Sequence, residues 1–379
     1  MFKLIKNVAV YTPDELGVND ILIAGKSIAK IAKHIDVKGL DIEVFDYKGK
    51  MAIPGLIDNH VHVCGGGGEA SYQSRITDID ITQFQKAGIT SVIGVLGTDG
   101  YTRSMENLIA KTKALNEQGM TAYALTGSYQ VPVKTLTKSI TDDLLFVKEI
   151  IGTGEIAVSD HRSSHPSHDA FVRLLSETHV AGLLSGKSGV TNIHIGGGKA
   201  GLTPLIDVLE KTDVPVSKIH PTHINRSKAL LEAGIAYSKK YHATIDFTTY
   251  LGKEDDDLSA SKAFKKALEK GVDLKNITFS SDGQGSLPIF DDDKRFIKMG
   301  IGQVQSLFES LRSVVLDENI DLTRALYPVT KNTARIFQLK QKGELRVGFD
   351  ADIVIIDSDY QMVNSFYLGK AVKKTPLIF

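Results

Sequence analysis

The chain repeats one pattern: short apolar, β-rich runs recur about every 26 to 36 residues, separated by stretches with helical spacing. In residues 104–116, for example, Leu108, Ile109 and Leu115 lie near one helical face, and Gly119 follows as a stop. Near-continuous apolar strands alternating with amphipathic helices predict parallel strands buried on both faces. Eight such strands close into a TIM barrel of about 250 residues, so we predict an α/β fold with a (β/α)8 TIM barrel over residues 55–338. The predicted strands are 56–63, 91–97, 121–129, 155–162, 191–196, 218–225, 244–249 and 277–282.

The two chain ends lack this helical spacing. Residues 1–54 contain short strand-like pieces separated by Gly and Asp, and residues 339–379 contain the apolar run ADIVIID. Neither end could bury a core alone. We therefore expect both ends to pair into one small β-sandwich beside the barrel. The acidic runs 254–257 and 291–293 are expected to be solvated loops.

Composition excludes several kinds of partner and site. Lys+Arg and Asp+Glu each total 45, and no basic stripe stands out, so we expect no nucleic-acid partner. No apolar run approaches the ~20 residues that span a bilayer, and acidic and turn residues come too early for a secretory signal. We therefore expect a cytoplasmic protein without a membrane partner. The single cysteine, Cys64, excludes an internal disulfide and a Cys-rich zinc site, so His and carboxylates must hold any metal.

The carboxyl ends of the predicted strands carry possible metal ligands, and this is where TIM barrels place their chemistry. His60 and His62 end the first strand and, with a strand period of two, point to the same side, so both can reach one ion. His194, His223 and Asp282 end the fifth, sixth and eighth strands. A lone histidine in a strand is usually a core residue. Four histidines and one aspartate at one end of a barrel indicate a metal site instead.

These segments resemble the amidohydrolase superfamily, in which PGLIDNHVHV, single strand-end histidines and SSDG occur in this order. HVHVCGGGGEA, GVLGTD, LTGSYQVP, AVSDHR, PTHINR and SSDGQGS are further similar to one member group, the isoaspartyl dipeptidases, and VGFDADIVIID resembles the superfamily's closing strand. The resemblance covers nearly the whole chain. It implies metal-dependent hydrolysis of the isopeptide bond of L-isoaspartyl (β-aspartyl) dipeptides by a homo-oligomer.

The resemblance also implies a role for each ligand. His60 and His62 would bind one zinc ion together with Asp282, and His194 and His223 would bind a second. Two divalent metal ions lower the pKa of a bridging water and polarise the scissile carbonyl. Asp282 would take the proton of the bridging hydroxide and pass it to the leaving amine. Because His and carboxylate ligands also suit Mn, Fe and Co, the native metal stays open.

One position departs from the family, which bridges its metals with a carbamylated lysine in the fourth strand. This chain has Glu155 at that place and no lysine in residues 152–162. A glutamate also carries the oxygen pair that a bridge requires, although its carboxylate stands about three bonds nearer the backbone. We predict that Glu155 bridges the metals; a single-metal site and an inert site are the alternatives.

The matching positions also supply a pocket for a dipeptide with one ammonium and two carboxylates. Glu69 would pair with the ammonium, and Arg162 and Arg226 would clamp carboxylates with their planar guanidinium groups. Tyr129 would donate its hydroxyl to the carbonyl oxygen as negative charge develops. Further substrate contacts are predicted at Gly67, Thr98 and Ser286. The glycine run 65–68 lacks the GK[ST] of a phosphate loop, so it serves close backbone approach to the substrate or a tight turn.

Some residues are left without a role in catalysis. We interpret His220 as structural, because it lies three residues before His223 and would face the other side of its strand. His165 and His168 are expected in a solvated loop. Cys64 lies two residues after His62, and a thiolate ligand there is the less favoured interpretation.

Two other functions remain open at this stage. The chain could be a different amidohydrolase, such as an N-acyl-amino-acid deacylase or a cyclic-amide hydrolase, or a catalytically silent scaffold. Glu69 and the two arginines favour a zwitterionic substrate over a neutral ring. The complete set of metal ligands argues against a scaffold.

Overall fold

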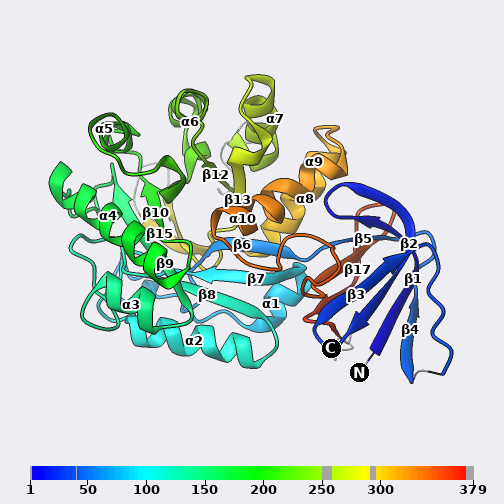
Figure 1. Cartoon of the computed structure of the whole chain (residues 1–379). Helices are drawn as coiled ribbons and strands as arrows, with labels where there is room; N and C mark the ends of the chain where they lie inside the picture. Colours follow the sequence, from blue (N-terminus) through cyan, green and yellow to red (C-terminus); the bar gives the residue numbers. More distant parts are fainter. Residues whose placement is uncertain (1, 40, 250–257, 291–295, 373–379) are drawn as a thin grey trace.

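The computed structural model describes residues 2–39, 41–249, 258–290 and 296–372 (Figure 1). The acidic runs 254–257 and 291–293 lie outside the described residues. Within the described part of the chain, no helix is both long and apolar enough to cross a membrane.

Eight parallel strands form the barrel, as predicted. Six of them make one parallel sheet, in the order β11-β10-β9-β8-β7-β6, and β12 pairs with β13. Residues in these strands are buried on both faces, which explains their near-continuous apolar sequence. The strands are β6 (Leu56–Val61), β7 (Ile89–Gly94), β8 (Thr121–Thr126), β9 (Ile150–Val158), β10 (Val190–Ile195), β11 (Ile219–Thr222), β12 (Ile245–Thr248) and β13 (Ile277–Ser280).

The fourth barrel strand differs most from its predicted bounds of 155–162. β9 begins at Ile150, where its ladder with β8 starts, and ends at Val158. Glu155 therefore lies inside the strand, and Arg162 lies in the loop that follows.

Side chains and one isolated bridge complete the ring of strands. The Asn225 amide joins β11 to β12, because its Nδ2 donates to the Thr248 carbonyl at 2.9 Å and its Oδ1 accepts from the Thr248 amide at 2.8 Å. An isolated parallel bridge joins Val61, at the end of β6, to Gly283 beyond β13. The strand ends that carry the predicted ligands are thereby held next to one another.

The helices lie around the outside of these strands (Figure 1). The predicted helix over 104–116 is confirmed as α2, and its N-cap residue Ser104 accepts a hydrogen bond from the Asn107 amide. At the end of the barrel opposite the ligands, Ile336 and Phe337 pack against Ile57 and Ile93 from the strands. The helices are α1 (Ile81–Lys86), α2 (Met105–Glu117), α3 (Ile140–Phe146), α4 (His168–Ser185), α5 (Thr203–Lys211), α6 (Lys228–Tyr241), α7 (Ala260–Glu269), α8 (Gln305–Leu316), α9 (Leu322–Leu326) and α10 (Lys331–Ile336).

The two chain ends form one mostly antiparallel sheet of eight strands beside the barrel (Figure 1). The first part of β1 (Phe2–Tyr11) pairs with β4 and its later part with β5, and the sheet encloses its own core around Ile5, Ile23 and Phe366. This confirms the predicted fold class, and we keep 1–54 and 339–379 as the proposed limits of this unit. The other strands are β2 (Glu15–Ala24), β3 (Ser27–Ala32), β4 (Ile42–Asp46), β5 (Met51–Pro54), β16 (Ile353–Ile356), β17 (Met362–Tyr367) and β18 (Lys370–Ala371).

A feature that the sequence analysis did not predict is the antiparallel pair β14 (Ser286–Phe290) and β15 (Phe296–Ile301). It follows β13 directly, so Ser286 lies at its first position, four residues after Asp282.

Candidate metal centre

Glu155 lies at the centre of two groups of possible metal ligands. His60, His62 and Glu155 form one group, and Glu155, His194 and His223 form the other; within each group the ligand atoms lie within 4.8 Å of one another. All five side chains are buried. The structure therefore brings together, at four strands of the barrel, the residues that the sequence predicts to form one site.

The two oxygens of Glu155 face different pairs of histidines. Oε2 lies 3.4 Å from His60 Nε2 and 3.7 Å from His62 Nε2. Oε1 lies 2.7 Å from His194 Nδ1 and 3.3 Å from His223 Nε2. One oxygen toward each pair is the arrangement that a bridging carboxylate needs.

Asp282 lies on the side of the first pair. Its Oδ1 is 3.1 Å from His62 Nε2 and 3.7 Å from His60 Nε2, and its side chain is 18% exposed, so solvent or a ligand can reach it. The residue adopts a left-handed backbone with φ 52° directly after β13. This turn places the carboxylate over the barrel mouth.

Several buried polar atoms of this site have no hydrogen-bond partner among the described residues: His60 Nε2, Glu155 Oε2 and Asp282 Oδ1. Buried polar atoms in proteins are nearly always paired, so a group of unpaired ones needs an explanation. Nitrogen and carboxylate oxygen atoms are ligands for zinc and similar divalent cations. The residues present therefore fit a divalent metal centre.

Electrostatics keep the carboxylates of this site ionised. Burial opposes ionisation, but the positive charge of His60 and His194 holds the pKa of Glu155 well below its usual range. Burial also opposes the ionisation of Asp282, but the close contact with His62 and the charge of His60 hold its pKa below the usual value. Burial lowers the pKa of His223 to about 3, which leaves it neutral. Ionised carboxylates and neutral imidazoles are the forms that bind metal.

His60 differs from His223, because burial favours its neutral form but the Glu155 carboxylate raises its pKa to about 9. Metal binding at this residue must therefore displace a proton.

A chain of buried hydrogen bonds fixes the His60 ring. Its Nδ1 lies 3.1 Å from Asn192 Oδ1, and Asn192 Nδ2 lies 3.0 Å from His220 Nδ1. His220 Nε2 in turn lies 3.1 Å from Thr278 Oγ1, whose hydroxyl donates to Asp246. Because an amide oxygen only accepts, His60 Nδ1 carries a hydrogen, so the proton that a metal would displace is the one on Nε2, which faces Glu155.

These hydrogen bonds correct one step of the sequence reasoning about His220. The residue was expected to face away from His223 because three strand positions separate them. His223, however, lies just after β11 with a left-handed φ of 64°, so strand alternation does not extend to it. His220 lies inside the barrel behind His60, and burial lowers its pKa to about 4, which keeps it neutral.

The predicted contacts to substrate charges lie around Glu69. Its Oε1 accepts from Ser286 Oγ at 2.8 Å and lies 3.4 Å from Arg162 Nη1. Thr98 and Gly67 join Glu69 in lining a cavity of about 340 Å³. Glu69 and Arg162 thus carry opposite charges and contact each other. A zwitterionic ligand can replace this contact by pairing its ammonium with Glu69 and its carboxylate with Arg162.

Gly67 illustrates why the glycine run is needed. It adopts φ 79°, and an added Cβ would lie 2.2 Å from the Ser74 carbonyl oxygen. This favours the tight-turn interpretation of the run, and the contact of Gly67 with substrate stays a prediction.

Tyr129 and Arg226 lie close to the second pair of histidines, His194 and His223. The buried Tyr129 hydroxyl is 3.0 Å from His194 Nδ1, and burial together with the Glu155 charge raises its pKa well above the usual value, so it can donate a hydrogen bond. Arg226 follows His223 in an exposed position, and its charge contributes to the lowered pKa of His223.

Sequence reasoning missed the carboxylates that support the ligands. Asp58 accepts from the Ser281 amide at 3.1 Å and from its hydroxyl, which ties β6 to the segment carrying Asp282. Asp160 contacts both Arg162 and His194. Asp58 lies in the DNHVH segment and Asp160 in the SDHR segment. Their position next to proposed site residues could have identified them as supporting carboxylates.

Residues predicted to be outside the site are indeed elsewhere. His165 and His168 are exposed, but His168 is the first residue of α4 and does not lie in a loop as predicted. Cys64 is buried in the main core, its carbonyl oxygen accepts from Arg103, and burial raises the pKa of its thiol to about 12. A thiol held neutral in this way is a poor metal ligand.

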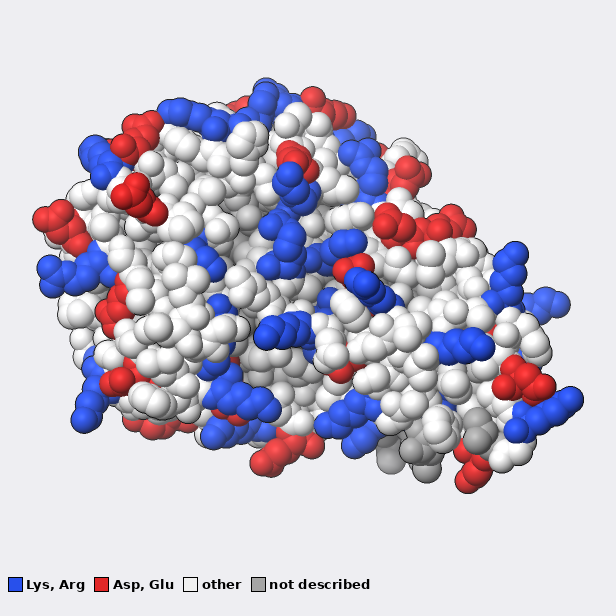
Figure 2. Space-filling model, in the orientation of Figure 1, with Lys and Arg blue, Asp and Glu red and all other residues white. Residues whose placement is uncertain are grey.

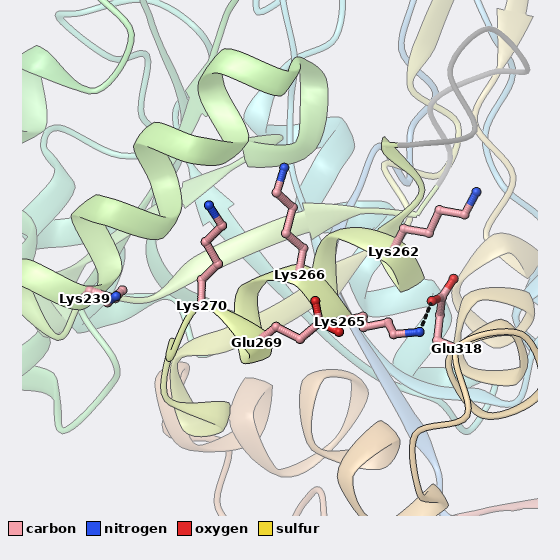
Figure 3. A pocket seen from close by; sticks show the side chains of 7 residues that line it. All are labelled: Lys239, Lys262, Lys265, Lys266, Glu269, Lys270 and Glu318. Atoms are coloured by element: carbon pink, nitrogen blue, oxygen red, sulfur yellow. Dashed lines mark ion pairs between the residues drawn. The ribbon is translucent and has the colours of Figure 1, made fainter.

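Among the residues that the structure describes, charged side chains elsewhere do not form a comparable metal site. Figure 2 shows Lys and Arg side chains near the middle of one face and both signs along its rim. A depression of about 790 Å³ on α6 and α7 is lined by lysines (Figure 3), but Lys265 pairs with Glu318, and Lys266 and Lys270 pair with Glu232. Exposed pairs of this kind contribute little energy, so its volume alone assigns it no chemistry.

Comparison with known proteins gives consistent results. The model of the amidohydrolase family matches residues 51–376. The β-aspartyl dipeptidase of Fervidobacterium islandicum AW-1 in complex with β-Asp-Leu is 38% identical, with 100% of this chain and 99% of that chain covered at a TM-score of 0.93. A second structure of the β-aspartyl dipeptidase from this organism is 37% identical, covers all of both chains and has a TM-score of 0.90. A dihydroorotase of Elusimicrobium minutum is 26% identical over 96% of this chain and 89% of the relative.

Proposed function

Because the chain belongs to the amidohydrolase family, we propose that it is a metal-dependent dipeptidase that hydrolyses the isopeptide bond of L-isoaspartyl dipeptides. The observation that carries this proposal is the position of Glu155 between two pairs of histidines, with one carboxylate oxygen toward each pair. The likeness to a dipeptidase structure that holds β-Asp-Leu supports the substrate class.

Two divalent cations, zinc in our proposal, would be held by the two ligand groups. His60, His62 and Asp282 would hold one ion, His194 and His223 the other, and Glu155 would bridge them. Bound there, the ions supply an activated water and polarise the scissile carbonyl.

The protein's own groups do the remaining work. Asp282 is ionised and partly exposed. Its carboxylate takes a proton from the attacking water and delivers it to the leaving amine nitrogen. Tyr129 donates its hydroxyl to the carbonyl oxygen as that oxygen gains charge. Glu69 pairs with the substrate ammonium, and Arg162 and Arg226 bind its carboxylates, so the amide is held over Glu155.

The decisive experiment measures metal content together with turnover of β-Asp-Leu, α-Asp-Leu, an N-acetyl-amino acid and dihydroorotate. We expect bound divalent metal and turnover of β-Asp-Leu well above the other three. Preference for the N-acetyl-amino acid or for the cyclic amide would replace the proposal with the corresponding amidohydrolase activity. A chain that binds no metal and turns over none of them would be a scaffold.

Arg226→Met is expected to raise KM for β-Asp-Leu by about 10- to 100-fold, because loss of a charge-assisted carboxylate contact costs about 1.5–3 kcal/mol. Metal content should stay at the wild-type value, since Arg226 is exposed and is not one of the possible metal ligands among the described residues. Steady-state kinetics and metal analysis on the same preparation test both parts. Loss of metal in parallel with the rise in KM would assign Arg226 a structural role instead.

The proposal keeps two further predictions from the sequence, a homo-oligomer and a cytoplasmic location. Large apolar side chains at the ends of α3 and α4 support a protein–protein contact there, because Phe146, Leu183 and Leu184 are 77%, 67% and 65% exposed.

A further inference from the structure

Asp160 connects a proposed substrate contact to a proposed metal ligand. Its Oδ1 accepts from Arg162 Nε at 3.0 Å and from the Arg162 amide at 2.8 Å. Its Oδ2 accepts from Arg162 Nη2 at 2.9 Å and lies 2.9 Å from His194 Nε2. The carboxylate is buried, with 6% of the residue exposed.

These contacts determine which nitrogen of His194 can bind a metal. A guanidinium only donates, so both oxygens of Asp160 act as acceptors, and the 2.9 Å contact requires a hydrogen on His194 Nε2. When this ring binds a metal, the nitrogen that can offer its lone pair is therefore Nδ1, which lies 2.7 Å from Glu155 Oε1. Asp160 therefore holds the ring with Nδ1 turned toward the proposed bridge.

The same carboxylate holds the Arg162 side chain in place. Arg162 donates three hydrogen bonds to Asp160, two from its side chain and one from its backbone amide, and its Nη1 is directed at Glu69 Oε1, 3.4 Å away. The Arg162 guanidinium carbon also lies 5.1 Å from the centroid of the Tyr129 ring, whose hydroxyl reaches His194 Nδ1. A displacement of Asp160 would thus move both the arginine and the histidine.

We propose that Asp160 is a positioning residue that orients His194 for metal binding and couples this ion to the Arg162 carboxylate clamp. The inference rests on the proposed function in assigning Arg162 to the substrate and His194 to a metal. Since coupling between two binding sites is reciprocal, substrate carboxylate and the ion at His194 should strengthen each other's binding.

The test is Zn²⁺ titration of the metal-free full-length protein in competition with a chromophoric chelator. In Asp160→Asn we expect the ion held by His194 and His223 to bind about 10- to 100-fold more weakly, as for other partners of ligating histidines. The ion held by His60 and His62 should keep its wild-type affinity. Asp207→Asn is the matched control, because Asp207 lines the same surface cavity as Asp160 but pairs with Lys211; both ions should bind it as in the wild type.

Two results would overturn the proposal. One is wild-type affinity of Asp160→Asn for both ions. The other is equal weakening of both ions, with a lowered Tm of the metal-free protein, which would give Asp160 only a folding role. These affinities do not depend on which amide is hydrolysed, so failure of the dipeptidase assignment would leave the measurement interpretable.

The coupling has its own readout in a double-mutant cycle. Arg162→Met should raise KM for β-Asp-Leu. Asp160→Asn should then raise KM much less in the Arg162→Met variant than in the wild type, because the two residues act as one unit. Independent, multiplicative effects on KM would contradict the coupling.

Discussion

Glu155→Ala is expected to bind about one metal ion per chain where the wild type binds about two, and to lose more than about 100-fold in turnover of β-Asp-Leu. The reason is geometric, because each oxygen of Glu155 faces a different pair of histidines and no other described carboxylate reaches both pairs. Without the bridge, four histidines would surround two neighbouring cations with less negative charge to offset their repulsion. Metal analysis after gel filtration and steady-state kinetics measure the two effects.

The controls separate the bridging role of the Glu155 carboxylate from an effect of side-chain size. Glu155→Gln keeps the size of the side chain and removes its charge, so it should resemble Glu155→Ala in metal content. Wild-type activity should also be the same after CO₂ is stripped from the assay and after bicarbonate is restored, because a glutamate bridge needs no carbamylation. Two ions retained by both variants, or activity that returns only with bicarbonate, would contradict a Glu155 bridge.

The barrel and its ligands could be predicted because they depend on local, periodic features of the sequence. Strands buried on both faces appear as continuous apolar runs, as in β7 and β10, and parallel strands present all their carboxyl ends at one edge. His60, His62 and His194 follow directly from this rule. Glu155 could not be predicted from this rule, because it lies inside β9. Only the family resemblance pointed to its position.

The supporting network could not be predicted, because its members are distant in sequence and contact one another only in the folded barrel. Asn192 and His220 are 28 residues apart, and Ser281 and Asp58 are 223 apart. His220 was also misplaced because strand alternation fails where His223 turns into a left-handed conformation. A backbone of that kind is uncommon for a non-glycine residue, and the sequence carries no direct signal for it.

Asp282→Asn is expected to lower kcat for β-Asp-Leu by about 10²- to 10⁴-fold, the usual contribution of a general acid–base residue. KM should change little, because the proposed contacts to the substrate charges come from Glu69, Arg162 and Arg226. The amide keeps the shape of the side chain and an oxygen near His62 Nε2, at the place where Oδ1 now lies 3.1 Å away, so most of the bound metal should remain. What the variant loses is a group that can carry a proton from the water to the leaving nitrogen.

A comparison of Asp282→Asn with His62→Asn, prepared and assayed in the same way, distinguishes proton transfer from metal binding. His62→Asn removes a ligand from the same ion, so its loss of activity should follow its loss of metal and be partly restored by added Zn²⁺. Asp282→Asn should bind nearly the wild-type amount of metal and should not recover at any Zn²⁺ concentration. If excess Zn²⁺ restored Asp282→Asn, Asp282 would act as a metal ligand only, and the proton would need another carrier.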